Sequence, residues 1–278
     1  MTSLPSRSAL VPVTPSILSY YKTRAGNRAP LHELRGGKMA PDAAHALFLL
    51  HARVSELGGT LLITDAYRSA DSQRKARQKY QNWLTAGKPA RSSEAYDKQT
   101  MKSSFISRAG RSFHNAGRAV DIAHMLAAPD DVPKKEKLDW LWDAAIPLGW
   151  RPIIKSPREG QREAWHFDFM GPWLPVYERL GYAQAAMCAV LDLGLGKDLY
   201  DRPWERWVQA QIQRAGEDIG DVDGWFGKMT KAGAENLGIG HLFYARDERH
   251  GSFLPVERVA LEKALVALPD AATPLTLV

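Results

Sequence analysis

The sequence predicts an α+β fold, in which a small antiparallel sheet carries flanking helices, followed by a smaller all-α unit. Strand-length apolar segments alternate with amphipathic helical segments up to about residue 175, and only helical segments follow. The length of 278 residues allows one full domain and a smaller one. We therefore divide the chain into a lead-in over residues 1–38, a first domain over 39–175 and a helical domain over 176–278.

The elements of the first domain follow from its apolar periodicity. A helix is expected over 42–57, where apolar side chains recur with helical spacing and two glycines follow. Residues 85–112, rich in Ser, Gly, Lys and Arg, are expected to form a long loop, and such loops inside compact domains are often functional. The remaining elements are strands over 60–64, 119–123, 150–154 and 164–169, and helices over 72–83 and 135–148.

The composition excludes several classes of protein. The net charge of +6 suits an anionic partner, but the basic residues are scattered and no recognition motif is present, so no nucleic-acid binding is expected. No run of about 18 apolar residues occurs, so no membrane span is expected, and the first residues lack a secretory signal pattern. The single cysteine, Cys188, lies in an apolar run and is expected to be a small buried side chain.

Two segments carry residues suited to metal-assisted hydrolysis. They are His114-Asn-Ala-Gly-Arg-Ala-Val-Asp121 and Glu163-Ala-Trp-His166. Two histidines and one aspartate can hold zinc and leave its fourth position to water, whose pKa then falls to about 7. Glu163 is placed to take the proton from that water and pass it to the departing amine. We expect Gly117 to allow a tight turn, and strand alternation to separate Asp121 from the apolar face of Val120 and Ile122.

Three segments together resemble a known family. Ser112-Phe-His-Asn-Ala-Gly-Arg-Ala-Val-Asp121 resembles the Ser-x-His-x-x-Gly-x-Ala-x-Asp motif of the zinc D-Ala-D-Ala peptidases of the M15 family, which includes VanX- and VanY-type enzymes. Glu163-Ala-Trp-His166 is similar to their Glu-x-x-His motif. Asp65-Ala-Tyr-Arg-Ser69, with Gln73, is similar to their Gly-Tyr-Arg-Ser segment, although Ala66 replaces the glycine. The resemblance covers roughly residues 38–175.

The resemblance implies a role for each site residue. Glu163 would be the general base, and Arg68 would bind a substrate carboxylate or stabilise the oxyanion, since its fork of donors suits either role. Ser112 would support the His114 loop or contact substrate. One zinc ion would be bound by His114, Asp121 and His166, and the substrate-binding residues would be Arg68, Ser112, Tyr67 and Gln73.

The substrate implied by the resemblance is the peptide stem of bacterial peptidoglycan. Related phage enzymes that cut L-Ala-D-Glu tend to have Asp-x-Pro-His in place of Glu163-Ala-Trp-His166, so a D,D-carboxypeptidase or D,D-endopeptidase is favoured. The expected setting is a monomeric phage endolysin released through a holin-type pore, or a wall-lytic enzyme delivered by a secretion system. The alternative is a non-catalytic peptidoglycan-binding protein on a peptidase fold, against which the presence of Glu163 argues.

The C-terminal region resembles the three-helix peptidoglycan-binding domain. Its helices are expected over 177–193, 205–215, 228–237 and 256–268, and the resemblance rests on the Leu/Val-Gln helix that begins at Val208 and on the turn Asp223-Gly-Trp-Phe-Gly227. Trp225 and Phe226 are expected in a small core, and Thr230 is expected to cap the following helix. The alternative is a helical appendage that packs on the first domain.

Overall fold

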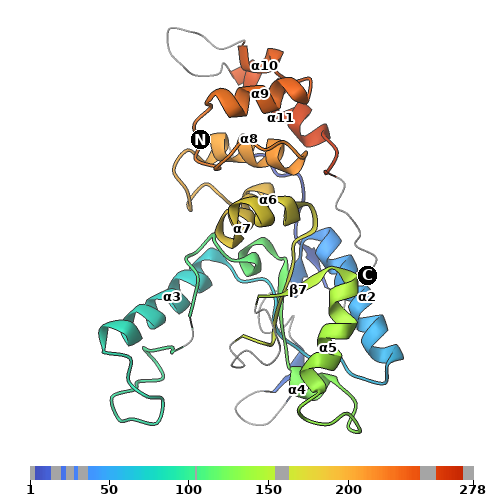
Figure 1. Ribbon diagram of the computed structural model, residues 1–278. Helices are drawn as coiled ribbons and strands as arrows, with labels where there is room; N and C mark the ends of the chain where they lie inside the picture. The colour runs from blue at the N-terminus through green and yellow to red at the C-terminus, as the bar shows by residue number, and fades with distance from the viewer. Residues whose placement is uncertain are drawn as a thin grey trace.

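The molecule has a lower part built around a sheet and an upper part of stacked helices (Figure 1). The expected α+β class with an all-α extension is therefore confirmed. The computed structural model describes residues 4–13, 20–22, 28–30, 37–103, 105–153, 163–244 and 255–271.

A four-stranded antiparallel sheet forms the centre of the lower part. Its strand order is β5-β6-β8-β7, so the strands that carry Asp121 and His166 are neighbours. The first strand begins three residues later than expected, although Leu61 and Leu62 before it are buried. The strands are β5 (Ile63–Asp65), β6 (Ala119–Ile122), β7 (Trp150–Pro152) and β8 (His166–Phe169).

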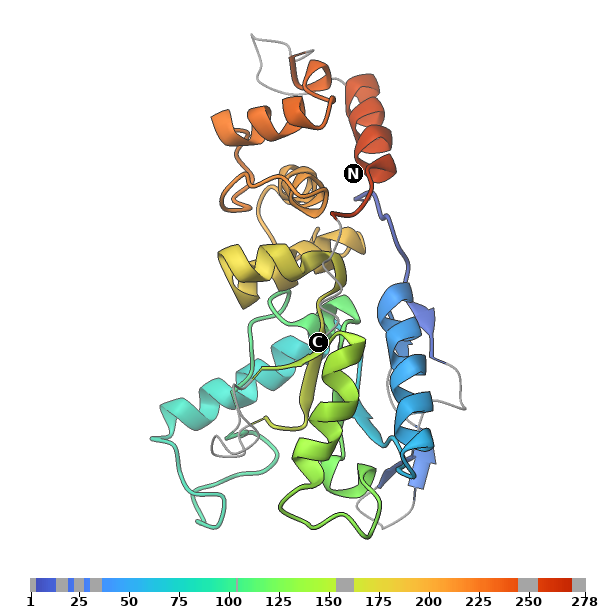
Figure 2. The same ribbon diagram turned by 45° about the vertical axis from the view of Figure 1, so that its right-hand side comes forward.

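One face of this sheet is apolar and covered by helices α2 (Pro41–Glu56) and α5 (Lys137–Ala145). Val120 and Ile122 pack into this core, as the strand alternation predicted. Figure 2 shows the two helices alongside the sheet. The opposite face is left for polar side chains.

Helix α3 (Ala70–Thr85) extends away from the sheet and carries the long loop at its far end (Figure 1). Ser69 caps the helix, because its hydroxyl oxygen accepts a hydrogen bond from the Ser72 amide. Thr85 still belongs to the helix, and the described residues of the loop after it contain no helix or strand, as expected. Short helical elements elsewhere in this part are η1 (Phe113–Ala116), α4 (His124–Ala127), η2 (Ile146–Leu148) and η3 (Gly171–Trp173).

The upper part consists of helices only. The prediction of one helix over 177–193 is wrong, because Gly181 adopts φ 78° and ψ 177° and divides it into two. This backbone conformation is open mainly to glycine. No helix in the described ranges is both long and apolar enough to cross a membrane. The helices are α6 (Leu174–Leu180), α7 (Tyr182–Asp192), α8 (Pro203–Arg214), α9 (Lys228–Asn236), α10 (His241–Tyr244) and α11 (Pro255–Ala267).

The hydrophobic core of the upper part continues into the lower part. Phe113 and Ala116 of η1 belong to the same buried cluster as Val190 of α7 and Trp207 of α8. Cys188 is buried in this cluster, as expected, and burial raises the pKa of its thiol. The boundary near residue 175 stays a prediction, but a shared core ties the two sides of it together.

The lead-in contacts both parts of the molecule. Leu4 joins the upper core, and the Arg7 amide donates to the Asp192 carbonyl at 3.1 Å. Further along, β1 (Val11–Pro12) pairs with β4 (Lys38–Met39), and β2 (Tyr20–Lys22) pairs with β3 (Arg28–Pro30). The described part of the lead-in therefore joins the two parts of the molecule.

The turn before α9 differs from prediction in two ways. Trp225 does not enter the core: it is 60% exposed, and the Arg202 guanidinium lies 3.1 Å from its ring centroid. Phe226 does pack against the core. Thr230 lies inside α9 and does not cap it, and its hydroxyl accepts a hydrogen bond from Gln209 Nε2 at 3.3 Å.

Substitution of Arg214 should destabilise the helical part. This buried guanidinium donates to the Leu265 and Leu268 carbonyls, each at 2.9 Å, and pairs with Asp270. Arg214→Met removes all of these hydrogen bonds and a buried charge pair, although Asp270 keeps Arg7 as a partner, so we expect a loss of about 2–4 kcal/mol in the free energy of unfolding. Chemical denaturation would measure it.

The matched control is Arg53→Met, which removes an exposed ion pair with Glu56 on α2. The free energy of unfolding should fall by less than about 1 kcal/mol in this variant. Equal losses for the two variants would contradict the structural role of Arg214.

Candidate metal centre

The centre is built on the register between β6 and β8. This register places Asp121 directly opposite His166, and opposite residues of an antiparallel pair project from the same face. That face is turned away from α2 and α5. Asp121 Oδ1 lies 3.0 Å from His166 Nδ1.

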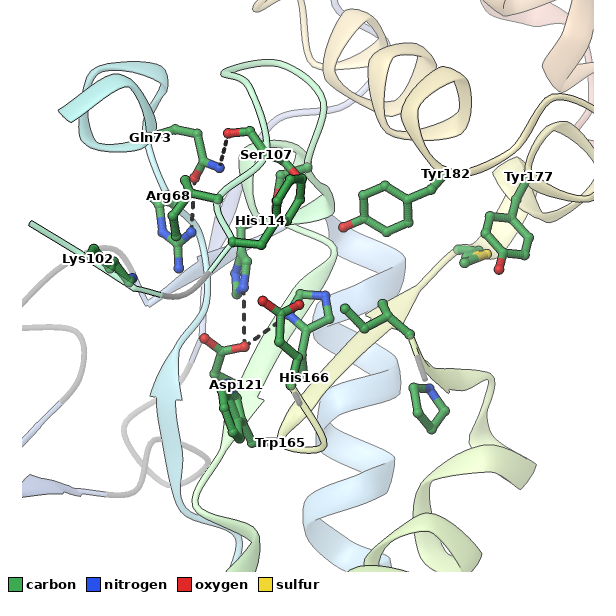
Figure 3. Close-up of a pocket in the computed structure, with 17 residues that line it drawn as sticks. Arg68, Gln73, Lys102, Ser107, His114, Asp121, Trp165, His166, Tyr177 and Tyr182 are labelled. Carbon is green, nitrogen blue, oxygen red and sulfur yellow. Dashed lines mark hydrogen bonds and ion pairs between the residues drawn. The ribbon is translucent and has the colours of Figure 1, made fainter. Parts of the chain in front are cut away.

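His114 reaches the same point from η1. Gly117 ends this short helix with φ 62°, and a Cβ there would lie 2.4 Å from Leu10 Cδ2, so the predicted requirement for glycine is confirmed. His114 Nε2 lies 3.4 Å from Asp121 Oδ1. One ligand atom from each of His114, Asp121 and His166 lies within 4.8 Å of the other two (Figure 3).

The second nitrogen of each imidazole is also occupied. His114 Nδ1 lies 2.5 Å from the Ala66 carbonyl oxygen, and His166 Nε2 lies 2.9 Å from Asp168 Oδ1. These partners leave Nε2 of His114 and Nδ1 of His166 for a metal. Acceptors behind ligating histidines orient the rings and raise their basicity, so this donor set fits zinc.

Charge is concentrated in this buried cluster. Burial alone raises the pKa of Asp121, but His114 and His166 lower it well below its usual range. Burial alone lowers the pKa of His166, but Asp168 and Asp121 raise it well above its usual range. Metal binding to His166 must therefore compete with a proton on its imidazole.

Glu163 lies in the turn that leads into β8. Its φ of 57° is unusual for a residue other than glycine, and its carbonyl accepts a hydrogen bond from the His166 amide at 2.9 Å. Its side chain lines the same cavity as the three ligands. Burial raises the pKa of the carboxyl, which favours proton acceptance and return.

Arg68 is held by its neighbours rather than free in solvent. Nε and Nη2 donate to Asp65 Oδ2, and Nη1 donates to Gln73 Oε1 at 3.0 Å. Gln73 is fixed in turn by the Ser107 carbonyl, to which its Nε2 donates at 2.9 Å. The Arg68 amide donates to the His114 carbonyl at 3.0 Å, so this arginine and the metal centre share one rigid segment.

A cavity of about 340 Å³ opens over the centre. The long loop contributes five of its lining residues, namely Lys102, Phe105, Ile106, Ser107 and Ser112, while Tyr177 and Tyr182 line it from α6 and α7. Tyr67 is not among the lining residues. The predicted site residues that do line it are Arg68, Gln73, Ser112, His114, Asp121, Glu163 and His166.

The other histidines play no part in this cavity as far as the structure describes them. His45 and His51 lie on α2 and His241 lies on α10, and none of them lines it. His32, His250 and the side chain of His124 lie outside the described residues.

Comparison with known proteins agrees with this geometry. Residues 36–172 match the model of the VanY family, described as D-alanyl-D-alanine carboxypeptidase. This part of the chain belongs to the VanY family. The expected enzyme class, a zinc-dependent peptidase of the D-Ala-D-Ala type, is thereby confirmed, and the ligand cluster agrees with the expected zinc ion.

Two further comparisons complete the findings. The chain is similar to a crystal structure of a glutamate-to-alanine mutant of the vancomycin resistance D,D-pentapeptidase VanY from a VanB-type cassette, in complex with Zn(II). The identity is 17%, with 68% of this chain and 94% of that chain covered, and the TM-score is 0.32. No curated protein sequence matches the chain significantly.

Sequence reasoning missed Asp168, Lys102, Tyr177 and Tyr182. Asp168 could have been found, because it follows His166 by two residues on a strand and must share its face. Lys102 lies in a loop without periodicity, so no pattern indicated it. The two tyrosines lie beyond the predicted boundary and were assigned to the helical domain.

Removal of Asp168 should weaken zinc binding. Asp168→Ala deletes the acceptor behind His166, so we expect zinc affinity to fall by roughly 10- to 100-fold, as for other acceptors behind metal-bound histidines. Competition with a chromophoric chelator would measure it. Asp168→Asn keeps an acceptor oxygen and should lose less. An unchanged affinity in the alanine variant would contradict the role.

Proposed function

We propose that the protein is a zinc D,D-peptidase that hydrolyses the D-Ala-containing ends or cross-links of peptidoglycan stem peptides. The observation that carries the proposal is the cluster of His114, Asp121 and His166 with Glu163 beside it in one cavity. The match of this region to a family described as D-alanyl-D-alanine carboxypeptidase supports the choice of bond.

Zinc and Glu163 have different roles in the proposed hydrolysis. When bound, zinc supplies a water of lowered pKa and polarises the carbonyl under attack. The Glu163 carboxylate takes the proton from water and returns it to the leaving amine, and its half-buried position keeps bulk water from competing. The three metal ligands keep their places because the core under the sheet fixes β6 and β8, and the core of the upper part fixes η1.

Arg68 is oriented for substrate or transition-state contacts. Its hydrogen bonds to Asp65 and Gln73 use one hydrogen on each guanidinium nitrogen, so one N–H on Nη1 and one on Nη2 have no partner among the described residues. These can meet a substrate carboxylate or the developing oxyanion. Gln73 acts through Arg68 in this arrangement, as its Oε1 accepts from Nη1.

The wider setting is proposed from the sequence. An endolysin or an injected wall-lytic enzyme, a monomeric state and a wall-binding role for residues 176–278 stay predictions. The alternative of a non-catalytic wall-binding protein is disfavoured because Glu163 lines the cavity together with all three ligands.

The test is mass spectrometry of purified peptidoglycan after incubation with the zinc-loaded protein, with and without a chelator. We expect chelator-sensitive loss of terminal D-Ala or new ends at D-Ala. New ends at L-Ala would move the assignment to L-Ala-D-Glu cleavage. No new ends with zinc bound would overturn the proposal and favour the non-catalytic alternative.

Two variants should separate metal binding from proton transfer. Glu163→Gln removes the base but none of the three ligands, so zinc should remain bound while kcat falls by about 100-fold or more. His166→Ala removes a ligand, so zinc content and turnover should both be lost.

Zinc content by atomic emission and kcat on a D-Ala-D-Ala peptide would be measured in parallel. Near-normal kcat in the Glu163 variant would sink the assignment of the base. Full zinc content in the His166 variant would contradict the assignment of His166 as a ligand.

A further inference from the structure

The cavity has two chemically different ends. Arg68 and Lys102 lie on one side of the metal ligands, and Tyr177 and Tyr182 lie on the other (Figure 3). A peptide that crosses the centre would therefore meet cations at one end and aromatic side chains at the other. The polarity of the cavity sets the direction of the bound chain.

Lys102 is held at the cationic end by the backbone of the long loop. Its amide donates to the Lys79 carbonyl of α3 at 3.1 Å, which ties this part of the loop to the helix. The side chain is half-buried and lines the cavity. It points toward Arg68 and Asp121 in Figure 3.

The positive charge of Arg68 is already balanced. Asp65 accepts two hydrogen bonds from its guanidinium, and the pair carries no net charge. Lys102 differs, since its ammonium has no hydrogen bond or ion pair with any described residue. Among the described residues that line the cavity, Lys102 therefore supplies the positive charge that no carboxylate neutralises directly.

An anionic group bound at this end would give the Lys102 ammonium an ion-pair partner. Burial lowers the pKa of Lys102, and the nearby Arg68 charge lowers it further, although Asp121, Asp65 and Glu163 raise it. A half-buried ammonium without a partner is costly, and a carboxylate is its natural partner. Among the described residues that line the cavity, Tyr177 and Tyr182 mark the other end with phenolic groups, and the two cations, Arg68 and Lys102, lie away from it (Figure 3).

We propose that Lys102 is a specificity-determining residue that binds, together with Arg68, the free C-terminal carboxylate of the substrate. The inference rests on the proposed function and deepens it. The carboxylate of the leaving residue binds Lys102 and the free N–H groups of Arg68. The upstream stem extends toward Tyr177, and Lys102 determines specificity without taking part in proton transfer.

The test compares two peptides that differ only at the C-terminus: diacetyl-L-Lys-D-Ala-D-Ala with a free carboxylate, and its C-terminal amide. Neither has a side-chain carboxylate, so only the terminal group can respond. Values of kcat/KM are measured for the wild type, Lys102→Ala and Lys102→Arg. The matched control is Lys98→Ala, which removes an exposed lysine from the same loop.

We expect the wild type to favour the acid over the amide. Lys102→Ala should lower kcat/KM for the acid by roughly 10- to 100-fold, the worth of one charge-assisted hydrogen bond, through a higher KM, and leave the amide unchanged. Lys102→Arg should keep most of the preference, and Lys98→Ala all of it. Calorimetric titration of both peptides into Glu163→Gln, with and without Lys102→Ala, should show the same difference in binding without turnover.

The outcomes distinguish a failure of the carboxylate subsite from a failure of the proposed peptidase function. Equal losses on acid and amide, or no loss on either, would overturn the carboxylate subsite while the peptidase assignment stands. A wild type that cleaves neither peptide and gives no new ends in peptidoglycan would overturn the proposed function, and the inference with it. Efficient cleavage of the amide by the wild type would favour an endopeptidase.

Discussion

The pairing of β6 with β8 is the constraint on which the rest of the site depends. Its register sets Asp121 opposite His166 and Ala119 opposite Asp168, so that a carboxylate, an imidazole and the acceptor behind that imidazole share one face. A slip of one residue in either strand would turn Val120 or Phe167 to this face and bury the ligand of that strand against α2 and α5. The apolar core on the far side prevents such a slip, because Val120, Ile122 and Phe167 are all fully buried there.

The sequence alone predicted those parts of the site whose positions follow from strand alternation or from a turn that needs glycine. Strand alternation placed Asp121 away from Val120, and Gly117 marked the turn after His114. It was insufficient where position depends on contacts distant in the chain. Lys102 enters the cavity because its loop folds back along α3, and Trp225 lies outside the core with the Arg202 guanidinium over its ring.

The helical part is more than an appendage in one respect: it completes the cavity. Tyr177 and Tyr182 reach the metal centre from α6 and α7, and the Phe113 amide lies 3.4 Å from the Tyr182 hydroxyl oxygen. Because η1 and α7 also share a core, the segment that carries His114 is supported from the helical side. Gly181 makes this possible, since the break between α6 and α7 lets both helices present a tyrosine to one cavity.

The segment Asp65–Arg68 explains why alanine can stand where the family has glycine. The contact that matters at position 66 is made by the backbone: the Ala66 carbonyl orients His114, and the Ala66 amide donates to Asp65 Oδ1 at 3.0 Å. Ala66 does not have a positive φ, so the conformation does not demand glycine. Its methyl group is buried in the core under the sheet, where a larger side chain would displace the carbonyl and with it the His114 ring. Asp65 meanwhile binds Arg68, so one short strand end fixes both a metal ligand and the guanidinium beside it.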